Sequence, residues 1–246
     1  MPVDYFSPDG PAFYQKRGFA IGTDAVMLYA FSRTVKAGKA VDFGCGSGII
    51  GILLARDRPG LLMTGIDISE DAVRAANDNA ELNGLKNRYE ALRGDLRAPE
   101  VFLKPGGFDL AVMNPPYYPA GSGKTVSDSL TALARTELTC SLRDACLAAK
   151  WAVRWGGHFC MVHKPERTAE VLYTLHDCGL EPKRLRFVHS RAAAAPSLLL
   201  ADAVRGAKPG LRIEAPLILQ NGDGTESEEI RQIYHRAQSN EKGENT

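Results

Sequence analysis

The stretch that follows residue 113 carries groups that could activate an amine. It reads Asn114-Pro115-Pro116-Tyr117, so the Asn114 side-chain oxygen and the Pro115 carbonyl offer two hydrogen-bond acceptors, and prolines contribute no N–H donors beside them. An exocyclic amine on an aromatic ring is a poor nucleophile because its lone pair is delocalised. Two acceptors bound to its N–H groups would turn that lone pair towards an electrophile, and Tyr117 would stack on a flipped-out base. Asn114, Pro115 and Tyr117 are therefore the predicted catalytic residues; the alternative is a proline-rich turn.

A glycine-rich stretch earlier in the chain could hold a cofactor. Glycines at alternate positions permit positive φ and close approach of a ligand, and the N–H groups of such a loop are expected to face that ligand. Gly46-x-Gly48-x-x-Gly51, with Asp67 further on, fits the dinucleotide fingerprint. Asp42-x-Gly44-x-Gly46-x-Gly48 fits the S-adenosylmethionine loop of class I methyltransferases equally well. A turn without a ligand is the third possibility, and the loop alone does not decide.

The chain alternates apolar runs of strand length with amphipathic stretches of helix length. This alternation predicts a doubly wound, mostly parallel, seven-stranded Rossmann-like α/β sheet, with one antiparallel strand near the C-terminus because the last two runs lack a helical spacer. In such sheets ligands bind at the carboxyl ends of the strands. The candidate groups Asp42–Gly48, Asp67, Asp95 and Asn114 all follow predicted strands. Strands are predicted at 40–43, 61–66, 89–93, 108–113, 158–162, 184–189 and 197–204, and helices at 47–57, 69–82, 138–155 and 167–178.

Domain organisation is predicted to be simple. Residues 1–220 should form one domain that begins with an N-terminal segment at 1–38; the family resemblance described below implies that this segment closes over the cofactor. Small and polar residues at 119–134 predict a mobile loop, and the polar composition of 221–246 predicts a tail.

Composition limits the remaining classes. The 246 residues carry a net charge of +1, so only local clusters of charge could attract a polyanion. Five cysteines show no metal-ligand spacing, which predicts no metal and a reducing, cytoplasmic environment. No leader-like segment and no apolar run of about 20 residues is present, so no membrane association is expected.

Four blocks together resemble one family. They are Gly22-Thr23-Asp24-Ala25-Val26-Met27-Leu28, Val41–Gly48, Asn114-Pro115-Pro116-Tyr117-Tyr118 and Glu181–His189. The first two are shared by many methyltransferases. The last two make the chain similar to the tRNA1(Val) (adenine37-N6)-methyltransferase family over about residues 13–220.

The resemblance implies a methyltransferase that uses S-adenosyl-L-methionine to methylate the exocyclic N6 amine of an adenine in tRNA, in particular adenine 37 of tRNA1(Val). Asn114 would be the catalytic acceptor. The implied cofactor-binding residues are Thr23, Asp24, Asp42, Gly44, Gly46, Gly48, Asp67, Ile68, Asp95, Leu96 and Asn114.

Substrate class is the open question at this point. A basic cluster at Lys183, Arg184, Arg186, His189 and Arg191 predicts an RNA-binding surface, against the alternative of a solvated, salt-bridged edge. The remaining alternatives are a glutamine-N5 methyltransferase of the release-factor type, N6-adenine methylation of another RNA or of DNA, and a non-catalytic RNA-binding protein. A nicotinamide dehydrogenase is disfavoured because the Asn-Pro-Pro-Tyr sequence has no role in hydride transfer.

Overall fold

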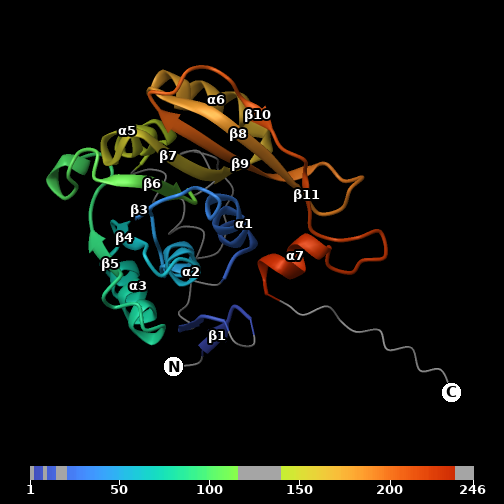
Figure 1. The fold of residues 1–246 in the computed structure, drawn as a ribbon, viewed down its shortest axis with the longest axis horizontal. Helices are drawn as coiled ribbons and strands as arrows, with labels where there is room; N and C mark the ends of the chain where they lie inside the picture. Colours follow the sequence, from blue (N-terminus) through green and yellow to red (C-terminus); the bar gives the residue numbers. More distant parts are fainter. Residues whose placement is uncertain (1–2, 8–9, 15–20, 116–139, 236–246) are drawn as a thin grey trace, which may run out of the picture.

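The computed structural model describes residues 3–7, 10–14, 21–115 and 140–235. Helices and strands alternate along most of the chain (Figure 1). In order they are β1 (Val3–Tyr5), β2 (Ala12–Tyr14), α1 (Thr23–Ser32), β3 (Lys39–Phe43), α2 (Ile49–Asp57), β4 (Leu62–Asp67), α3 (Glu70–Leu82), β5 (Tyr89–Arg93), the 3-10 turn η1 (Pro99–Val101), β6 (Phe108–Met113), α5 (Leu142–Ala152), β7 (Val153–His163), the 3-10 turn η2 (Pro165–Arg167), α6 (Thr168–Asp177), β8 (Leu180–His189), β9 (Pro196–Arg205), β10 (Arg212–Ile213), β11 (Leu217–Ile218) and α7 (Glu228–Ile233).

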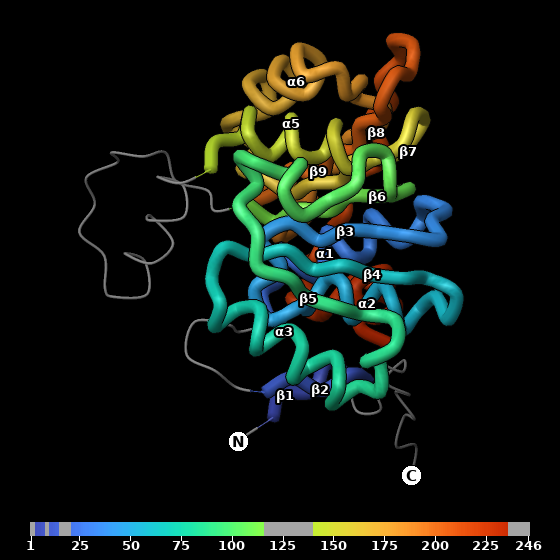
Figure 2. Tube along the Cα trace, turned by 90° about the vertical axis from the view of Figure 1, so that its left-hand side faces the viewer, coloured from blue at the N-terminus to red at the C-terminus, as the bar shows by residue number. Residues whose placement is uncertain are grey.

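The main sheet has the order β10-β8-β9-β7-β6-β3-β4-β5, and β11 also pairs with β8. Neighbouring strands from β7 through β6, β3 and β4 to β5 run parallel, whereas β9 is antiparallel to both β7 and β8. Figure 2 shows β6, β3, β4 and β5 lying one below another. The predicted doubly wound sheet with an antiparallel strand near the C-terminus is confirmed, and the described part of the chain adds the two-residue strands β10 and β11 to its seven long strands.

Alternating residues of the central strand point into two separate cores. Ala40 of β3 packs with the residues of α1, α2 and α3 on one face. Val41 and Phe43 pack with α5 and α6 on the other. By the same alternation the Asp42 side chain belongs to the face covered by α1, α2 and α3, and this determines what surrounds it.

The boundary between α5 and β7 differs from the prediction. We expected a helix over 138–155 ended by a glycine pair, but α5 ends at Ala152 and β7 begins at Val153. Val153 pairs with Phe108 of β6, and the register shifts before the next pair, so the strand continues through Gly156 and Gly157 as a bulge. A Cβ on Gly157 would lie 2.8 Å from the Arg154 carbonyl oxygen, so this bulge requires glycine. The loop predicted at 119–134 lies outside the described residues.

Both ends of the described chain pack against the domain. Phe6, between β1 and β2, is buried and stacks on Tyr234 at 5.2 Å between ring centroids. It also meets the edge of Tyr29 in α1. In α7, Ile230 and Ile233 are buried in the same core. The packed domain thus extends beyond residue 220, where the sequence predicted that a polar tail begins.

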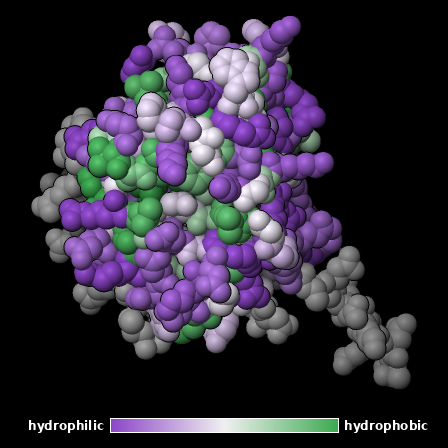
Figure 3. Space-filling model, turned by 60° about the vertical axis from the view of Figure 1, so that its left-hand side comes forward, coloured by the Kyte–Doolittle hydropathy of each residue, from purple (hydrophilic) through white to green (hydrophobic). Residues whose placement is uncertain are grey.

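The surface mixes polar and apolar side chains (Figure 3). Three large apolar side chains near one another in the fold remain exposed: Val101 in η1, and Leu147 and Trp151 in α5. None of the helices that the structure describes is long and apolar enough to cross a membrane.

Candidate functional site

The registers of the sheet bring the candidate residues to one edge. Phe43 pairs with Met113 of β6 on one side and with Ile66 of β4 on the other, and Asp67 pairs with Arg93 of β5. The carboxyl ends of β3, β4, β5 and β6 therefore lie side by side, and we call this edge the rim. The segments that leave the strands here are the glycine loop 44–48, Ile68, residues 94–96 and Asn114.

The glycine loop is held in an unusual conformation by hydrogen bonds to β4 and within the loop. Gly44, Gly46 and Gly48 have φ of 65°, 54° and 82°, which only glycine adopts readily. The Gly44 and Cys45 N–H groups both donate to the Ile66 carbonyl, at 2.8 and 3.0 Å. The Gly46 N–H donates to Asp67 Oδ2, and the Gly48 N–H donates to the Cys45 carbonyl. The expectation that the N–H groups of this loop face a ligand is therefore wrong for these four.

Asp42 is a buried carboxylate below the loop. Its side chain is 1% exposed, and neither oxygen completes a hydrogen bond with a described residue. Burial raises the pKa of the Asp42 carboxyl to about 8, an effect that the nearby Gly51 N–H opposes and the Asp67 charge reinforces. A buried carboxylate without a hydrogen-bond partner is costly and calls for a cation or a donor in its vicinity.

Asp67 closes the loop from the end of β4. Oδ2 accepts from the Gly46 N–H at 3.0 Å, and Oδ1 accepts from the Ser69 N–H at 2.9 Å. Burial raises the pKa of Asp67, and these backbone donors oppose the rise. Each carboxylate oxygen still has a second lone pair available for a ligand hydroxyl.

The donor and acceptor groups of this site fit one of the two predicted cofactors. Four backbone N–H groups of the loop are already bonded within the protein, and the ionisable side chains beneath and beside the loop, Asp42 and Asp67, are both acidic. A pyrophosphate needs free donors, which these four N–H groups no longer offer, and it would lie beside the acidic side chain of Asp67. S-adenosylmethionine brings a sulfonium cation, an ammonium group and ribose hydroxyls, which such acceptors suit. The residues present therefore fit S-adenosylmethionine. Asp67 would accept from its ribose hydroxyls, and Asp42, buried below the loop, would act on its cationic end through the loop.

Several glycines near the loop are explained by a side chain rather than by a ligand. A Cβ on Gly65 would lie 2.5 Å from the Tyr89 hydroxyl, and one on Gly51 would lie 2.6 Å from the Tyr89 ring. A Cβ on Gly48 would likewise lie 2.9 Å from this hydroxyl. In contrast, a Cβ on Gly44 would meet nothing within 4 Å, so that position needs glycine only for its positive φ. Gly51, read in the sequence as part of a dinucleotide fingerprint, makes room for Tyr89.

The remaining predicted cofactor residues lie around the rim with different surroundings. Ile68 is 38% exposed directly after Asp67, and Leu96 is buried after β5. Asp95 is paired with the Arg97 guanidinium at 2.6 Å, and this hydrogen bond holds the pKa of Asp95 below its usual range. Thr23 and Asp24 form the first turn of α1. The N-cap residue of this helix is Gly22, which has no side chain with which to cap it.

The predicted catalytic residues follow β6. Asn114 and the buried Pro115 leave the sheet beside the glycine loop, because the preceding Met113 pairs with Phe43. Tyr117 lies outside the described residues.

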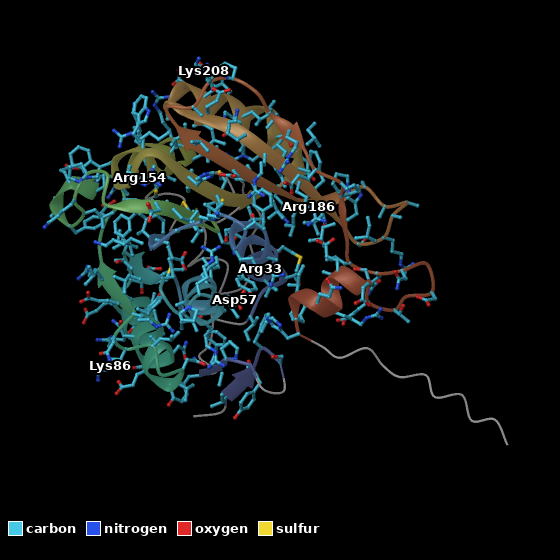
Figure 4. All side chains as sticks on the ribbon, in the orientation of Figure 1. Arg33, Asp57, Lys86, Arg154, Arg186 and Lys208 are labelled. Carbon is cyan, nitrogen blue, oxygen red and sulfur yellow. The ribbon has the colours of Figure 1, made fainter. Side chains whose placement is uncertain are left out.

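The predicted RNA-binding residues do not share one end of the sheet. His189 pairs with Pro196, so the loop 190–195 that carries Arg191 lies at the same edge as the end of β7, next to β6. Lys183, however, lies near the start of β8, at the opposite edge, where its ammonium group donates to the Lys208 carbonyl. Figure 4 shows Lys208 well separated from Arg186. The predicted cluster is thus divided between the rim and the opposite edge.

Arg184 and Arg186 are committed to contacts within the protein. Arg184 Nε lies 2.8 Å from Asp202, which is 1% exposed, and the guanidinium also pairs with Glu214 and stacks on Phe31. Arg186 makes a bidentate ion pair with Glu229 of α7, at 2.6 and 2.7 Å. Neither guanidinium could bind a phosphate without breaking these pairs. For these two residues the structure favours the salt-bridged alternative.

Sequence reasoning missed Asn79, a polar residue on the buried face of α3. Asn79 is 1% exposed and bonds both to the glycine loop and to β2. The signal was present, because Asn79 lies in line with buried Ala72, Ala75 and Ala76, where a polar side chain needs specific partners.

Comparison with known proteins shows which fold and which family this chain shares. In fold the chain resembles the crystal structure of a predicted O-methyltransferase from Agrobacterium tumefaciens, with a TM-score of 0.70 over 87% of this chain and 97% of that one, at 21% identity. The family model described as the methyltransferase small domain matches residues 9–141, over half of the chain. The chain therefore belongs to the methyltransferase small domain family, which confirms the predicted methyltransferase and its cofactor S-adenosylmethionine over the dehydrogenase alternative.

Two curated relatives are informative about the branch of this family. The tRNA1(Val) (adenine(37)-N6)-methyltransferase of Aeromonas salmonicida is 25% identical over 87% of this chain and 88% of its own length. The release factor glutamine methyltransferase of Chlorobaculum tepidum is 30% identical, over 69% of this chain and 65% of its own length. The first aligns over more of both chains.

Proposed function

We propose that this protein methylates the exocyclic N6 amine of an adenine in tRNA, in particular adenine 37 of tRNA1(Val). The observation that carries the proposal is the position of Asn114 and Pro115, which leave β6 beside the glycine loop. The similarity to the Aeromonas salmonicida enzyme over nearly the whole of both chains supports the tRNA substrate.

In this reaction the role of the protein is to position the adenine amine against the methyl group of the cofactor. When bound, S-adenosylmethionine supplies an electrophilic methyl group. The Asn114 side-chain oxygen and the Pro115 carbonyl accept the two N–H groups of the adenine amine, which directs the nitrogen lone pair at that methyl. No strong base is required before attack, because the methylated ammonium product is acidic and loses its proton readily. Tyr117 stacks on the flipped-out base.

Hydrogen-bond acceptors that bind the transition state more strongly than the substrate raise the rate of methyl transfer more than they raise substrate affinity. The amine gains positive character as the new bond forms, so its hydrogen bonds to Asn114 and Pro115 strengthen along the reaction. Asp42 and Asp67 act earlier, by holding the donor molecule against the loop.

Recognition of tRNA is assigned to the rim rather than to the whole basic cluster. Arg191 is exposed in the loop 190–195 and forms no ion pair with a described residue. His189 precedes that loop, and its Nδ1–H donates a hydrogen bond to the Ala194 carbonyl oxygen at 2.7 Å. Phosphate contacts at this loop would orient a tRNA arm while a loop adenine enters the site, since unpaired loop bases are the ones that can be splayed out.

A second candidate is methylation of a protein glutamine, because a release-factor enzyme is among the relatives. A side-chain amide also presents a weakly nucleophilic N–H₂ group that Asn114 and Pro115 could bind. The longer alignment with the Aeromonas salmonicida enzyme, which covers 87% of this chain and 88% of that one, favours the tRNA substrate.

Nucleoside mass spectrometry tests the proposal. An unmodified tRNA1(Val) transcript is incubated with S-adenosylmethionine and the protein, and then digested. We expect N6-methyladenosine with the wild-type protein and none with a transcript in which adenine 37 is replaced by guanine. Methylation of both transcripts would move the target elsewhere in the tRNA, and methylation of neither would refute the proposal.

A further inference from the structure

The Asn79 side chain joins two parts of the protein that are distant in sequence. Its Oδ1 accepts from the Tyr14 N–H of β2 at 2.9 Å, and its Nδ2 donates to the Ser47 carbonyl of the glycine loop at 2.9 Å. The chemistry of the partners fixes the orientation of the amide, because a backbone N–H can only donate and a carbonyl can only accept. Asn79 is therefore a two-sided connector between β2 and the loop.

Asn83, one turn further along α3, holds the same strand. Its Oδ1 accepts from the Ala12 N–H at 3.0 Å, and its Nδ2 donates to the Ala12 carbonyl at 2.7 Å. The two asparagines thus bind β2 much as a neighbouring strand would. Figure 2 shows β1 and β2 lying against α3, below the main sheet. Asn83 Nδ2 also donates to the Asn79 backbone carbonyl at 2.7 Å, and Asn83 makes no hydrogen bond to the described residues of the glycine loop, so it can act on the loop only through the hairpin and α3.

We propose that Asn79 is a positioning residue that couples docking of the N-terminal hairpin to the conformation of the glycine loop. Ser47 lies between Gly46 and Gly48, whose flexibility leaves the loop dependent on restraints from outside it. The Asn79 bond is such a restraint on the Ser47 carbonyl, and it is in place only when the amide is correctly oriented. The Tyr14 N–H provides that orientation.

The consequence is reciprocal. If a docked hairpin holds the loop in its binding conformation, a ligand bound to the loop must hold the hairpin by the same coupling free energy. The cofactor part of this inference rests on the proposed S-adenosylmethionine site, whereas the link between hairpin and loop does not.

A double-mutant cycle tests the coupling. S-adenosylhomocysteine binding is measured by calorimetry for wild type, Asn79→Ala, Asn83→Ala and the double variant. We expect Asn79→Ala to weaken binding about tenfold, since a buried hydrogen bond to the loop is lost. Asn83→Ala should weaken binding about threefold in the wild-type background and not at all in the Asn79→Ala background.

Two results would overturn the inference. One is Asn79→Ala binding within twofold of wild type, and the other is an Asn83→Ala effect of equal size in both backgrounds. Thermal unfolding of each variant is the control that tests whether the variant still folds. If Asn79→Ala does not fold, Asn79→Ser takes its place in the cycle.

Hydrogen exchange in the ligand-free protein gives a readout that does not depend on the cofactor. The Gly48 N–H donates to the Cys45 carbonyl at 2.8 Å and reports the order of the loop. Asn83→Ala should speed its exchange at least threefold, although Asn83 does not contact the loop, and unchanged exchange would refute the coupling. A wild-type protein that fails to bind S-adenosylhomocysteine would refute the proposed function, while this exchange measurement still decides the inference.

Discussion

Asp42 of β3 and Asp67 of β4 lie on either side of the glycine loop and differ in what they bind. Asp67 accepts from two backbone N–H groups, whereas Asp42 completes no hydrogen bond with a described residue. The difference suits two tasks, because Asp67 sets the shape of the loop and Asp42 keeps its acceptors for a ligand. It also makes Asp42 a group that opposes folding when the ligand is absent.

The Asp42 pKa predicts how stability varies with pH. Burial raises this pKa from 3.8 to about 8, so between these values the folded protein holds a proton that the unfolded chain releases. The free energy of unfolding contributed by Asp42 therefore falls as pH rises from about 4 to about 8, by at most about 1.4 kcal/mol per pH unit, and is constant above that range. Asn at this position cannot ionise.

Urea unfolding of wild type and Asp42→Asn across pH 4 to 9 checks this. The stability of the variant relative to wild type should increase with pH through this window. Parallel pH profiles would show that Asp42 does not titrate with a raised pKa.

Asn114 is predicted to act mainly in the transition state. Asn114→Ala removes an acceptor whose hydrogen bond strengthens as the methyl group is transferred, so kcat should fall by roughly a hundredfold or more. S-adenosylhomocysteine affinity, measured by calorimetry, should change little. Single-turnover methylation rates measure the first effect, and a variant with near wild-type turnover would remove Asn114 from the mechanism.

At the level of elements, strands β8 and β9 are joined by a buried ion pair. Arg184→Ala would leave the Asp202 carboxylate, 1% exposed, without its guanidinium partner, although His158 would still contact it. We expect a loss of about 3 kcal/mol in the free energy of unfolding. Arg212→Ala is the matched control, because the Arg212 side chain is 70% exposed and its ion pair should contribute less than about 1 kcal/mol. Urea unfolding measures both, and equal small losses would contradict this role of Arg184.

The elements themselves were predictable where local pattern and packing agree. The strands at 89–93 and 108–113 match β5 and β6, since short apolar runs between helices have few other structures open to them. The end of α5 was not predictable, because the start of β7 depends on pairing of Val153 with Phe108. The ion pair of Arg184 depends likewise on Asp202, 18 residues away on a paired strand.

For the site, the sequence indicated which residues reach the rim but not how they are used. Asp67 and Asn114 could be placed because they follow strands. That the loop would use its own donors, and that Gly51 and Gly65 make room for Tyr89, depended on side chains packed from other elements.

For the whole molecule, the position of basic groups relative to the rim predicts their effect on RNA binding. Arg191→Glu would remove the proposed phosphate contact at the rim, whereas Lys208→Glu changes the same charge at the opposite edge. We expect Arg191→Glu to weaken tRNA binding and to lower the slope of log affinity against log salt by about one unit. Lys208→Glu should change neither, and S-adenosylhomocysteine binding should be preserved in both. Filter-binding titrations at several salt concentrations measure both quantities. Equal affinities and equal salt slopes for the two variants would contradict the assignment of tRNA binding to the loop 190–195.

The central claim is methyl transfer to an adenine of tRNA rather than to a protein. The most direct measurement supplies S-adenosylmethionine with an isotopically labelled methyl group to a mixture of tRNA1(Val) transcript and unmethylated release factor. The tRNA and the protein are then digested separately and analysed by mass spectrometry. We predict label in N6-methyladenosine and none in N5-methylglutamine. Label in glutamine with none in adenosine would contradict the account and assign the protein to the release-factor branch of the family.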